Sequence, residues 1–400
     1  MTTSASPLAA LDPAAVRRVV LANGLTILVR QDRSAPVVAI VTYVKAGYFD
    51  ETDDVVGIAH VLEHMFFKGT GRRGVGEIAR ETKAQGGYLN AHTIYDHTSY
   101  YTVLPSSAFA AGLDIQADAY AASVIDAGEL AKELEVIIQE AKRKSDNPTA
   151  VTTETLYELL HDVHRMRRWR IGREEPLRAL RREHLLGFYR NFYRPSTTIL
   201  SIVGDVDPDA VIAEVERRYG ELPAGEPTRV PGAPEPERRE TRFRELSGDV
   251  AQSQLAFGWR TVPADHDDAP RLDMAAAVLA MGRASRLYRA VRERQLVSSV
   301  SAYNYTPTEL GVFVVHAETR PEKLVDAARA IHGQLVALRD GSIDPSELER
   351  ARRIYEARWL RRLESMDGQA NYLAEWEAAG GIELGERYLD ALLSATPSDV

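Results

Sequence analysis

The sequence predicts an α+β protein made of two tandem α+β domains. Three observations support this: an Asn-Gly hairpin signal near the start, apolar residues at helical spacing soon after it, and the same order of elements on both sides of a proline-rich linker. We expect a flexible arm over 1–15, a first domain over 16–221, the linker over 222–240 and a second domain over 241–400.

The first domain begins with a predicted hairpin. Apolar runs between Val19 and Val29 flank Asn23-Gly24, two residues that tolerate positive φ. A strand over 37–44 follows, and the apolar residues between Val55 and Phe67 then fall at helical spacing. The remaining expected elements are a strand, two helices, a strand and a helix: 98–104, 107–123, 129–144, 197–203 and 207–219.

The linker places prolines among charged residues, a composition that builds no core and tends to be extended. Beyond it the order of elements repeats, with a strand, two helices, two strands and two helices: 253–259, 272–281, 285–295, 300–305, 311–317, 321–338 and 345–362. Because Val400 ends a polar run after a helix, we expect the second domain to be C-terminally truncated.

Composition excludes several classes of protein. The chain has 49 Lys+Arg against 58 Asp+Glu and lacks the basic stripe of a nucleic-acid binder. It has no cysteine, which excludes disulfides, thiolate metal sites and a cysteine nucleophile. No apolar run approaches the roughly 18 residues of a membrane span, and the start lacks the apolar core of a signal peptide. We expect a cytoplasmic protein, or a periplasmic one whose leader has been removed.

The motif His60-Val61-Leu62-Glu63-His64 is the sharpest chemical signal. On a helix, residues four apart share a face, so both imidazoles can reach one ion. Glu63 lies at the edge of that face, where it could hold a water molecule. An apolar helix has little reason to carry three ionisable groups unless something charged meets them.

Two histidines leave a catalytic zinc one protein ligand short. Glu140 is the candidate, on the helix predicted over 129–144, and Glu133, seven residues earlier, falls on the same face. The alternative is a solvated acidic residue, which is common on helices. The run Val136-Ile137-Ile138 favours the metal, because it anchors this helix in the core.

These residues resemble the inverted-zincin peptidases of the pitrilysin, insulin-degrading enzyme and mitochondrial processing peptidase family, the M16 peptidases. About 75 residues after HxxEH comes the glutamate Glu140, and a second glutamate, Glu133, stands seven residues before Glu140. Further matches run in order along nearly the whole chain: Asn23-Gly24-Leu25, Gly57-Ile58-Ala59-His60, Phe67-Lys68-Gly69-Thr70, Gly86-Gly87-Tyr88-Leu89-Asn90-Ala91, Tyr193-Arg194-Pro195 and Val203-Gly204-Asp205.

The resemblance implies a fold like that of the mitochondrial processing peptidase, forming half or all of a clamshell. It implies one Zn²⁺ per chain, held by His60, His64 and Glu140, with Glu63 as general base and Glu133 as a carboxylate supporting the site. Zinc lowers the pKa of its bound water toward about 7, and an adjacent carboxylate can pass that proton to the leaving amine.

The resemblance also implies that an extended peptide adds to a sheet edge near Asn90 and Ala91. An ordinary turn residue is the alternative for Asn90. His92 and His97 lie near this strand, and nothing in their spacing makes them ligands, so we expect them at the surface or around the site. Another histidine pair, His161 and His164, is interpreted as part of a solvated helical face beside arginines.

The second domain departs from the family pattern. Its corresponding helix has no histidine pair, so we expect it to bind no zinc and to form the opposite wall of a chamber. Family members often present an arginine and a tyrosine from such a domain to the substrate carbonyl. Arg292 matches the arginine, but Ser298 stands in the place of the tyrosine. We therefore expect a homo- or heterodimer, or a second M16-like half that supplies this pair.

The resulting prediction is a zinc endopeptidase that cuts unstructured oligopeptides in an enclosed chamber. Three alternatives stay open: a processing peptidase that cuts specific precursors, an inactive scaffold subunit of a larger assembly, and a metal-dependent hydrolase of non-peptide substrates. The complete set of His60, Glu63, His64 and Glu140 argues against the scaffold.

Overall fold

The computed structural model describes residues 13–230, 232–341 and 343–400, and most of the arm predicted over 1–15 lies outside them. The described residues form two compact units. Unit 1 comprises residues up to 143, 169–232 and 361–383, and unit 2 comprises 144–168, 233–360 and 384–400. Both mix helices with sheet, which confirms the predicted α+β class.

Unit 1 is built on a sheet with the strand order β1-β2-β6-β3-β5-β4. Its strands are β1 (Val16–Val20), β2 (Thr26–Gln31), β3 (Val37–Val44), β4 (Tyr88–Thr93), β5 (Thr98–Pro105) and β6 (Thr198–Gly204). The strands β1 and β2 form the predicted hairpin around Asn23-Gly24. Only β2 and β6 pair in parallel, and β4 lies at an edge of the sheet.

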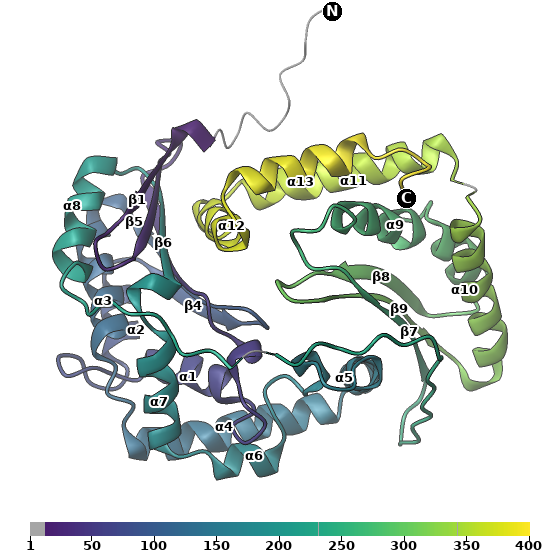
Figure 1. Cartoon of the computed structure of the whole chain (residues 1–400), viewed down its shortest axis with the longest axis horizontal. Coiled ribbons are helices and arrows are strands. Elements are labelled where there is room, and N and C mark those ends of the chain that lie inside the picture. Colours follow the sequence, from purple (N-terminus) through teal and green to yellow (C-terminus); the bar gives the residue numbers. More distant parts are fainter. Residues whose placement is uncertain (1–12, 231, 342) are drawn as a thin grey trace, which may run out of the picture. The chain divides into compact units, whose positions relative to one another are not determined.

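Helices cover both faces of this sheet (Figure 1). The helices of unit 1 are α1 (Ile58–Phe66), α2 (Glu77–Ala84), α3 (Phe109–Ala122), α4 (Ala127–Ser145), α6 (Glu174–Ala179), α7 (Arg182–Phe192), α8 (Pro208–Tyr219) and α12 (Met366–Ala379). Helices α3 and α8 lie on one face, and α12 lies on the other against β3 and β6. Residues of β3 are therefore buried on both sides of the strand.

Unit 2 has a three-stranded antiparallel sheet in the order β7-β9-β8. Its strands are β7 (Ser253–Thr261), β8 (Ser299–Tyr305) and β9 (Gly311–Thr319). Its helices are α5 (Pro148–Leu160), α9 (Ala269–Ala280), α10 (Leu324–Arg339), α11 (Pro345–Arg362) and α13 (Glu383–Ser394). The predicted helix over 285–295 is instead a short π-helix, Tyr288–Arg292.

Each unit contains one helix that comes from the other half of the chain. Helix α5 comes from the first half but packs on β7, where a Cβ on Gly258 would lie 2.8 Å from Leu156. Helix α12 comes from the second half but packs on the sheet of unit 1. The sequence patterns did not predict this exchange, because they report the local period of a helix and not the sheet it covers.

A partly buried carboxylate makes the stability of unit 2 depend on pH. Asp273 on α9 accepts a hydrogen bond from the Tyr388 hydroxyl at 2.6 Å. Burial raises the pKa of Asp273 to about 6, and hydrogen bonds from Tyr388 and Asn304 only partly oppose this effect. Because the folded pKa lies above the unfolded one, this residue's stabilising contribution is present at low pH and is lost as pH rises through about 6.

We expect the free energy of unfolding of Asp273→Asn, relative to that of the native chain, to rise by about 1.4 kcal/mol between pH 5 and pH 8, because only the part of the pKa shift between pH 5 and about 6 falls in this interval. Urea unfolding at both pH values measures the difference. Asp267→Asn, which changes an exposed carboxylate before the same helix, is the control. An equal effect of Asp273→Asn at both pH values would show that Asp273 does not titrate in this range.

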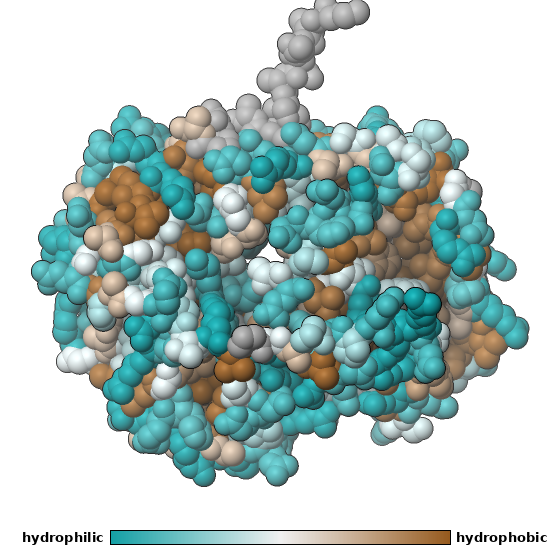
Figure 2. Space-filling view, viewed as in Figure 1, coloured by the Kyte–Doolittle hydropathy of each residue, from teal (hydrophilic) through white to brown (hydrophobic). Residues whose placement is uncertain are grey.

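The visible surface is mainly hydrophilic, with hydrophobic residues in separate patches (Figure 2). No helix formed by the described residues is long and apolar enough to cross a membrane.

Candidate metal centre

The helix α1 begins at a left-handed turn that requires glycine and that a buried carboxylate caps. Gly57 has φ 96°, and a Cβ at this position would lie 2.3 Å from the carbonyl oxygen of Ile171. The buried Glu51 side chain accepts hydrogen bonds from the N–H groups of Gly57 and Ala59, both at 3.0 Å. The first N–H groups of a helix have no partner within the helix, and a carboxylate at this position accepts hydrogen bonds from them. Its negative charge also interacts favourably with the positive end of the helix dipole. This cap fixes the start of the helix that carries HxxEH.

The two histidines of α1 lie on one face of the helix. The His60 and His64 rings have centroids 4.7 Å apart. His60 is buried, and the His64 side chain is 25% exposed. The apolar residues of α1 are buried and hold the helix in unit 1: Ile58, Val61, Leu62, Met65 and Phe66.

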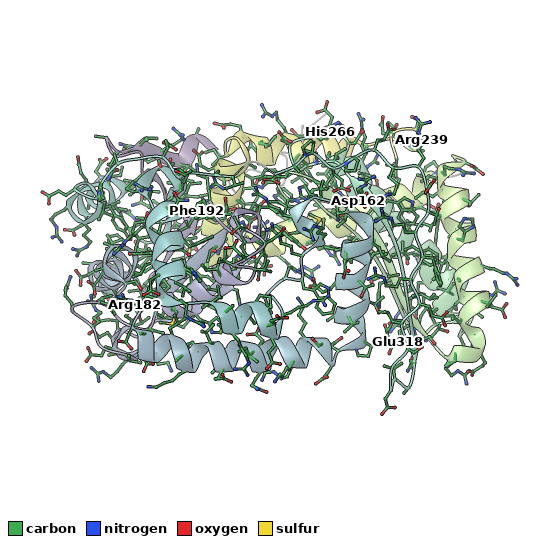
Figure 3. The ribbon with its side chains drawn as sticks, turned by 60° about the horizontal axis from the view of Figure 1, so that its bottom comes forward. Asp162, Arg182, Phe192, Arg239, His266 and Glu318 are labelled. Carbon is green, nitrogen blue, oxygen red and sulfur yellow. The ribbon has the colours of Figure 1, made fainter. Side chains whose placement is uncertain are left out.

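The second helix of the site, α4, is anchored at its start by an arginine. Arg182 on α7 donates hydrogen bonds to the carbonyl groups of Val124 and Ile125, just before α4 begins (Figure 3 labels Arg182). Ile137 and Ile138 are buried and fix the rotation of α4. Carboxylates seven residues apart on this helix share a face, and the structure places both Glu133 and Glu140 beside His64.

Glu133 orients the His64 ring. The Nδ1 atom of His64 lies 3.1 Å from Oε2 of Glu133, and Nε2 lies 3.9 Å from Oε2 of Glu140. Because an ionised carboxylate only accepts hydrogen bonds, Nδ1 donates to Glu133, and Nε2 is the ring atom that faces Glu140. Lys68 also donates to Glu133. Burial alone would raise the pKa of Glu133, but hydrogen bonds from Lys68 and His64 outweigh it and hold the pKa below its ordinary value.

We expect Glu133→Gln to weaken zinc binding by about 10- to 100-fold, because carboxylates that orient a ligating imidazole typically contribute that much. Competition with a chromophoric chelator measures the affinity. Glu135→Gln on the same helix, which removes an exposed carboxylate paired with Arg178, is the control. Equal affinities of Glu133→Gln and the control would show that Glu133 does not support the metal.

His60, His64 and Glu140 are placed so that they could hold one metal ion. Each offers a ligand atom, and these atoms all lie within 4.8 Å of one another. Two imidazoles with one carboxylate match the ligand set of a catalytic zinc, which keeps a further position open for water. Within residues 13–230, 232–341 and 343–400, this is the one group of three or more histidine or acidic side chains with such geometry.

Glu63 points to the end of β4. Its Oε2 accepts a hydrogen bond of 2.6 Å from the Thr93 hydroxyl. Burial raises the pKa of Glu63, and the hydrogen bond from Thr93 and the charge of His64 oppose this only in part. Analysis of the sequence did not single out Thr93, Lys68 or Glu51 as site residues, since their contacts arise only when separate segments of the fold come together.

The predicted substrate residues Asn90 and Ala91 lie on the edge strand β4. Asn90 is exposed, and its Oδ1 accepts the N–H of Ala91 at 2.8 Å. Since β4 pairs with β5 on one side only, its other side can accept a further strand.

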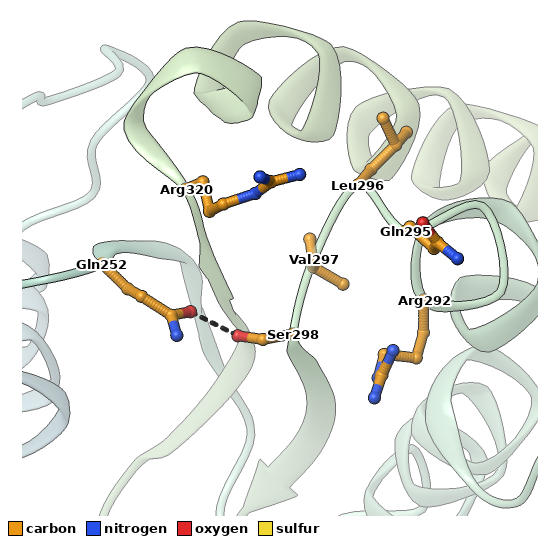
Figure 4. Close-up of a pocket in the computed structure, with 7 residues that line it drawn as sticks. All are labelled: Gln252, Arg292, Gln295, Leu296, Val297, Ser298 and Arg320. Atoms are coloured by element: carbon orange, nitrogen blue, oxygen red, sulfur yellow. Dashed lines mark hydrogen bonds between the residues drawn. The ribbon is translucent and has the colours of Figure 1, made fainter.

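Arg292 lies in unit 2, in a different unit from the candidate metal ligands. It lines a pocket of about 220 Å³ together with Gln252, Gln295, Leu296, Val297, Ser298 and Arg320 (Figure 4). The Ser298 hydroxyl donates to Gln252 at 2.6 Å and lies 3.1 Å from the carbonyl oxygen of Glu318. The role of Arg292 toward a substrate stays a prediction.

The interpretation of His161 and His164 as a solvated helical face is wrong. Helix α5 ends at Leu160, and both histidines are buried beyond it. His161 Nδ1 contacts the Tyr157 carbonyl at 2.8 Å, and His164 Nε2 lies 3.2 Å from Glu309. Neighbouring arginines suggested exposure, but contacts within unit 2 bury both rings.

The histidines near β4 pair with each other. The Nε2 atoms of His92 and His97 lie 3.3 Å apart, and His97 is buried, with its Nδ1 near the hydroxyl of Tyr43 and the carboxylate of Asp96. Neither belongs to the group that could hold a metal.

Comparisons with known proteins agree with this fold. Residues 26–170 match the family described as insulinase, peptidase family M16, and residues 179–355 match the peptidase M16 inactive domain. An uncharacterised zinc protease of Rickettsia felis is 32% identical over 76% of this chain and 73% of its own length.

Solved structures show the same fold. A protease from Helicobacter pylori has a TM-score of 0.91 and 24% identity, over 96% of this chain and 94% of that one. The periplasmic protease PqqL from Escherichia coli has a TM-score of 0.77 and 19% identity, and the match spans 45% of its length.

A helix with HxxEH in the first of two tandem α+β domains is the pattern of the inverted-zincin class. The chain belongs to the M16 peptidase family. The insulinase match is followed along the chain by the inactive-domain match, so the predicted tandem fold is confirmed.

Proposed function

We propose that this chain is a zinc-dependent endopeptidase that hydrolyses unstructured oligopeptides. The observation that carries the proposal is the convergence of His60, His64 and Glu140, with ligand atoms within 4.8 Å of one another. Glu63 stands beside these ligands on α1, and the names of relatives as zinc proteases support the choice of metal.

Each residue around the proposed metal ion has a separate role in peptide hydrolysis. When bound, zinc would lower the pKa of a water molecule toward about 7 and polarise the scissile carbonyl. Glu63 would accept a proton from the attacking water at its carboxylate and deliver it to the leaving amine. Glu133 keeps His64 in the tautomer that a ligand needs, and Lys68 balances the charge of Glu133.

The free side of β4 is the place we propose for the peptide. An extended segment that pairs with β4 gains backbone hydrogen bonds, and Asn90 and Ala91 would contact it. Thr93, at the end of the same strand, contacts Glu63, so a peptide along β4 passes close to the proposed base.

We also propose that a second M16-like half, from a different chain, supplies an arginine and tyrosine to the substrate. The observation that favours this is Ser298, which stands where the tyrosine would be and is hydrogen-bonded within unit 2. A scaffold role is the competing candidate, because the second domain matches an inactive-domain family model.

Cleavage of a quenched-fluorescent peptide mixture by the purified chain tests the proposal. Cleavage that a zinc chelator and Glu63→Gln both abolish is the expected result. A chain that carries one zinc and stays silent would indicate a missing partner half or a scaffold, and a second M16-like chain added to the assay separates these two. Silence without zinc would contradict the metal assignment.

A further inference from the structure

Thr93 joins the proposed general base to the edge strand. It is the last residue of β4 and pairs with Thr98, the first residue of β5. Its hydroxyl oxygen lies 2.6 Å from Oε2 of Glu63 on α1, thirty residues earlier in the chain. A contact of this length is a strong hydrogen bond to a charged acceptor.

The direction of this hydrogen bond follows from counting protons. A hydroxyl has one proton, and an ionised carboxylate has none to donate. Thr98 directs its proton to the carbonyl oxygen of Ala46 at 3.0 Å, and the Thr93 and Thr98 oxygens are 3.3 Å apart. The Thr93 hydroxyl therefore donates its proton to Glu63, and the Thr98 hydroxyl lies next to the Thr93 hydroxyl.

The Thr93 hydroxyl is held rigidly. Its backbone belongs to the β4–β5 ladder, and a branched Cβ leaves χ1 few choices. Thr98 beneath it is buried. Among the described residues, Oε2 of Glu63 has this hydrogen bond, whereas Oε1 has none to the protein.

We propose that Thr93 is a positioning residue, which fixes the Glu63 carboxylate by one oxygen so that the other faces the reacting water and the leaving amine. The inference rests on the proposed peptidase function. Because Thr93 ends β4, the strand proposed to pair with the peptide also sets the position of the base.

Thr93→Val and Thr93→Ser test this role in the full chain. Valine keeps the shape and removes the hydroxyl, whereas serine keeps the hydroxyl. We expect valine to lower kcat by about 10- to 100-fold, as misplacement of a reacting group does, with KM nearly unchanged. Serine should restore most of kcat. Thr261→Val, which removes a strand-end hydroxyl bonded to Asn304 in unit 2, should have no effect.

Two sets of measurements distinguish a misplaced Glu63 carboxylate from an unstable fold or a lost metal ion. Zinc affinity and urea unfolding of Thr93→Val should stay close to those of the native chain, and its crystal structure with zinc should show the Glu63 carboxylate turned from its native position. An unchanged kcat, or a serine variant as impaired as the valine variant, would overturn the proposal. If the native chain binds zinc but cleaves nothing even when a second M16-like chain is added, the proposed function fails. An unmoved Glu63 carboxylate in the valine variant would then overturn the positioning role separately.

Discussion

Glu63→Gln is expected to lower kcat by on the order of 10²–10⁴-fold while the chain keeps its zinc, because general-base catalysis typically contributes that much. Glutamine has nearly the same size and can still accept the Thr93 hydrogen bond, but it cannot take a proton from water. The side chain is partly buried and is hydrogen-bonded to the end of β4, so a conservative replacement is needed to keep the packing.

Steady-state cleavage of a fluorogenic peptide measures kcat, and elemental analysis measures the zinc content. Glu216→Gln on α8 removes an exposed carboxylate and should leave both values unchanged. A Glu63→Gln variant that turns over like the native chain would exclude Glu63 as the base. A variant that loses zinc would instead place Glu63 among the groups that hold the metal.

Replacement of any one of the three proposed ligands by alanine should remove zinc from the purified chain. His60, His64 and Glu140 each supply one of three protein ligands, so we expect each loss to exceed the 10- to 100-fold typical of residues that only orient a ligand. Cleavage should disappear in parallel. Glu140 is the most informative of the three, because its side chain is 35% exposed and its replacement opens little space in the core.

Isothermal titration of the metal-free variants with Zn²⁺ measures the loss. His332→Ala, which removes an exposed imidazole on α10, controls for nonspecific binding by histidine. Native affinity in the Glu140→Ala variant would exclude Glu140 as a ligand and leave Glu133 as the nearest carboxylate to His64.

Local patterns predicted the elements that hold the site. Apolar residues at helical spacing indicated α1, the Asn-Gly pair indicated the β1–β2 hairpin, and a spacing of seven placed Glu133 and Glu140 on one face of α4. Each is a property of a single segment, set by helical or strand geometry.

What the sequence did not predict depends on contacts between distant segments. The cap of α1 by Glu51, the hydrogen bond of Thr93 to Glu63 and the exchange of α5 and α12 all join parts that no periodicity connects. The same reason explains the error at His161, whose arginine-rich neighbours suggested exposure although packing in unit 2 buries it.

A zinc titration followed by peptide cleavage tests the central claim most directly. Metal-free chain is mixed with increasing Zn²⁺, and cleavage is recorded at each step beside the same series for Glu63→Gln. We predict that activity rises with zinc, reaches a plateau at one equivalent per chain and never appears in the variant. Cleavage that is independent of zinc, or equal in both series, would contradict the assignment of His60, Glu63, His64 and Glu140.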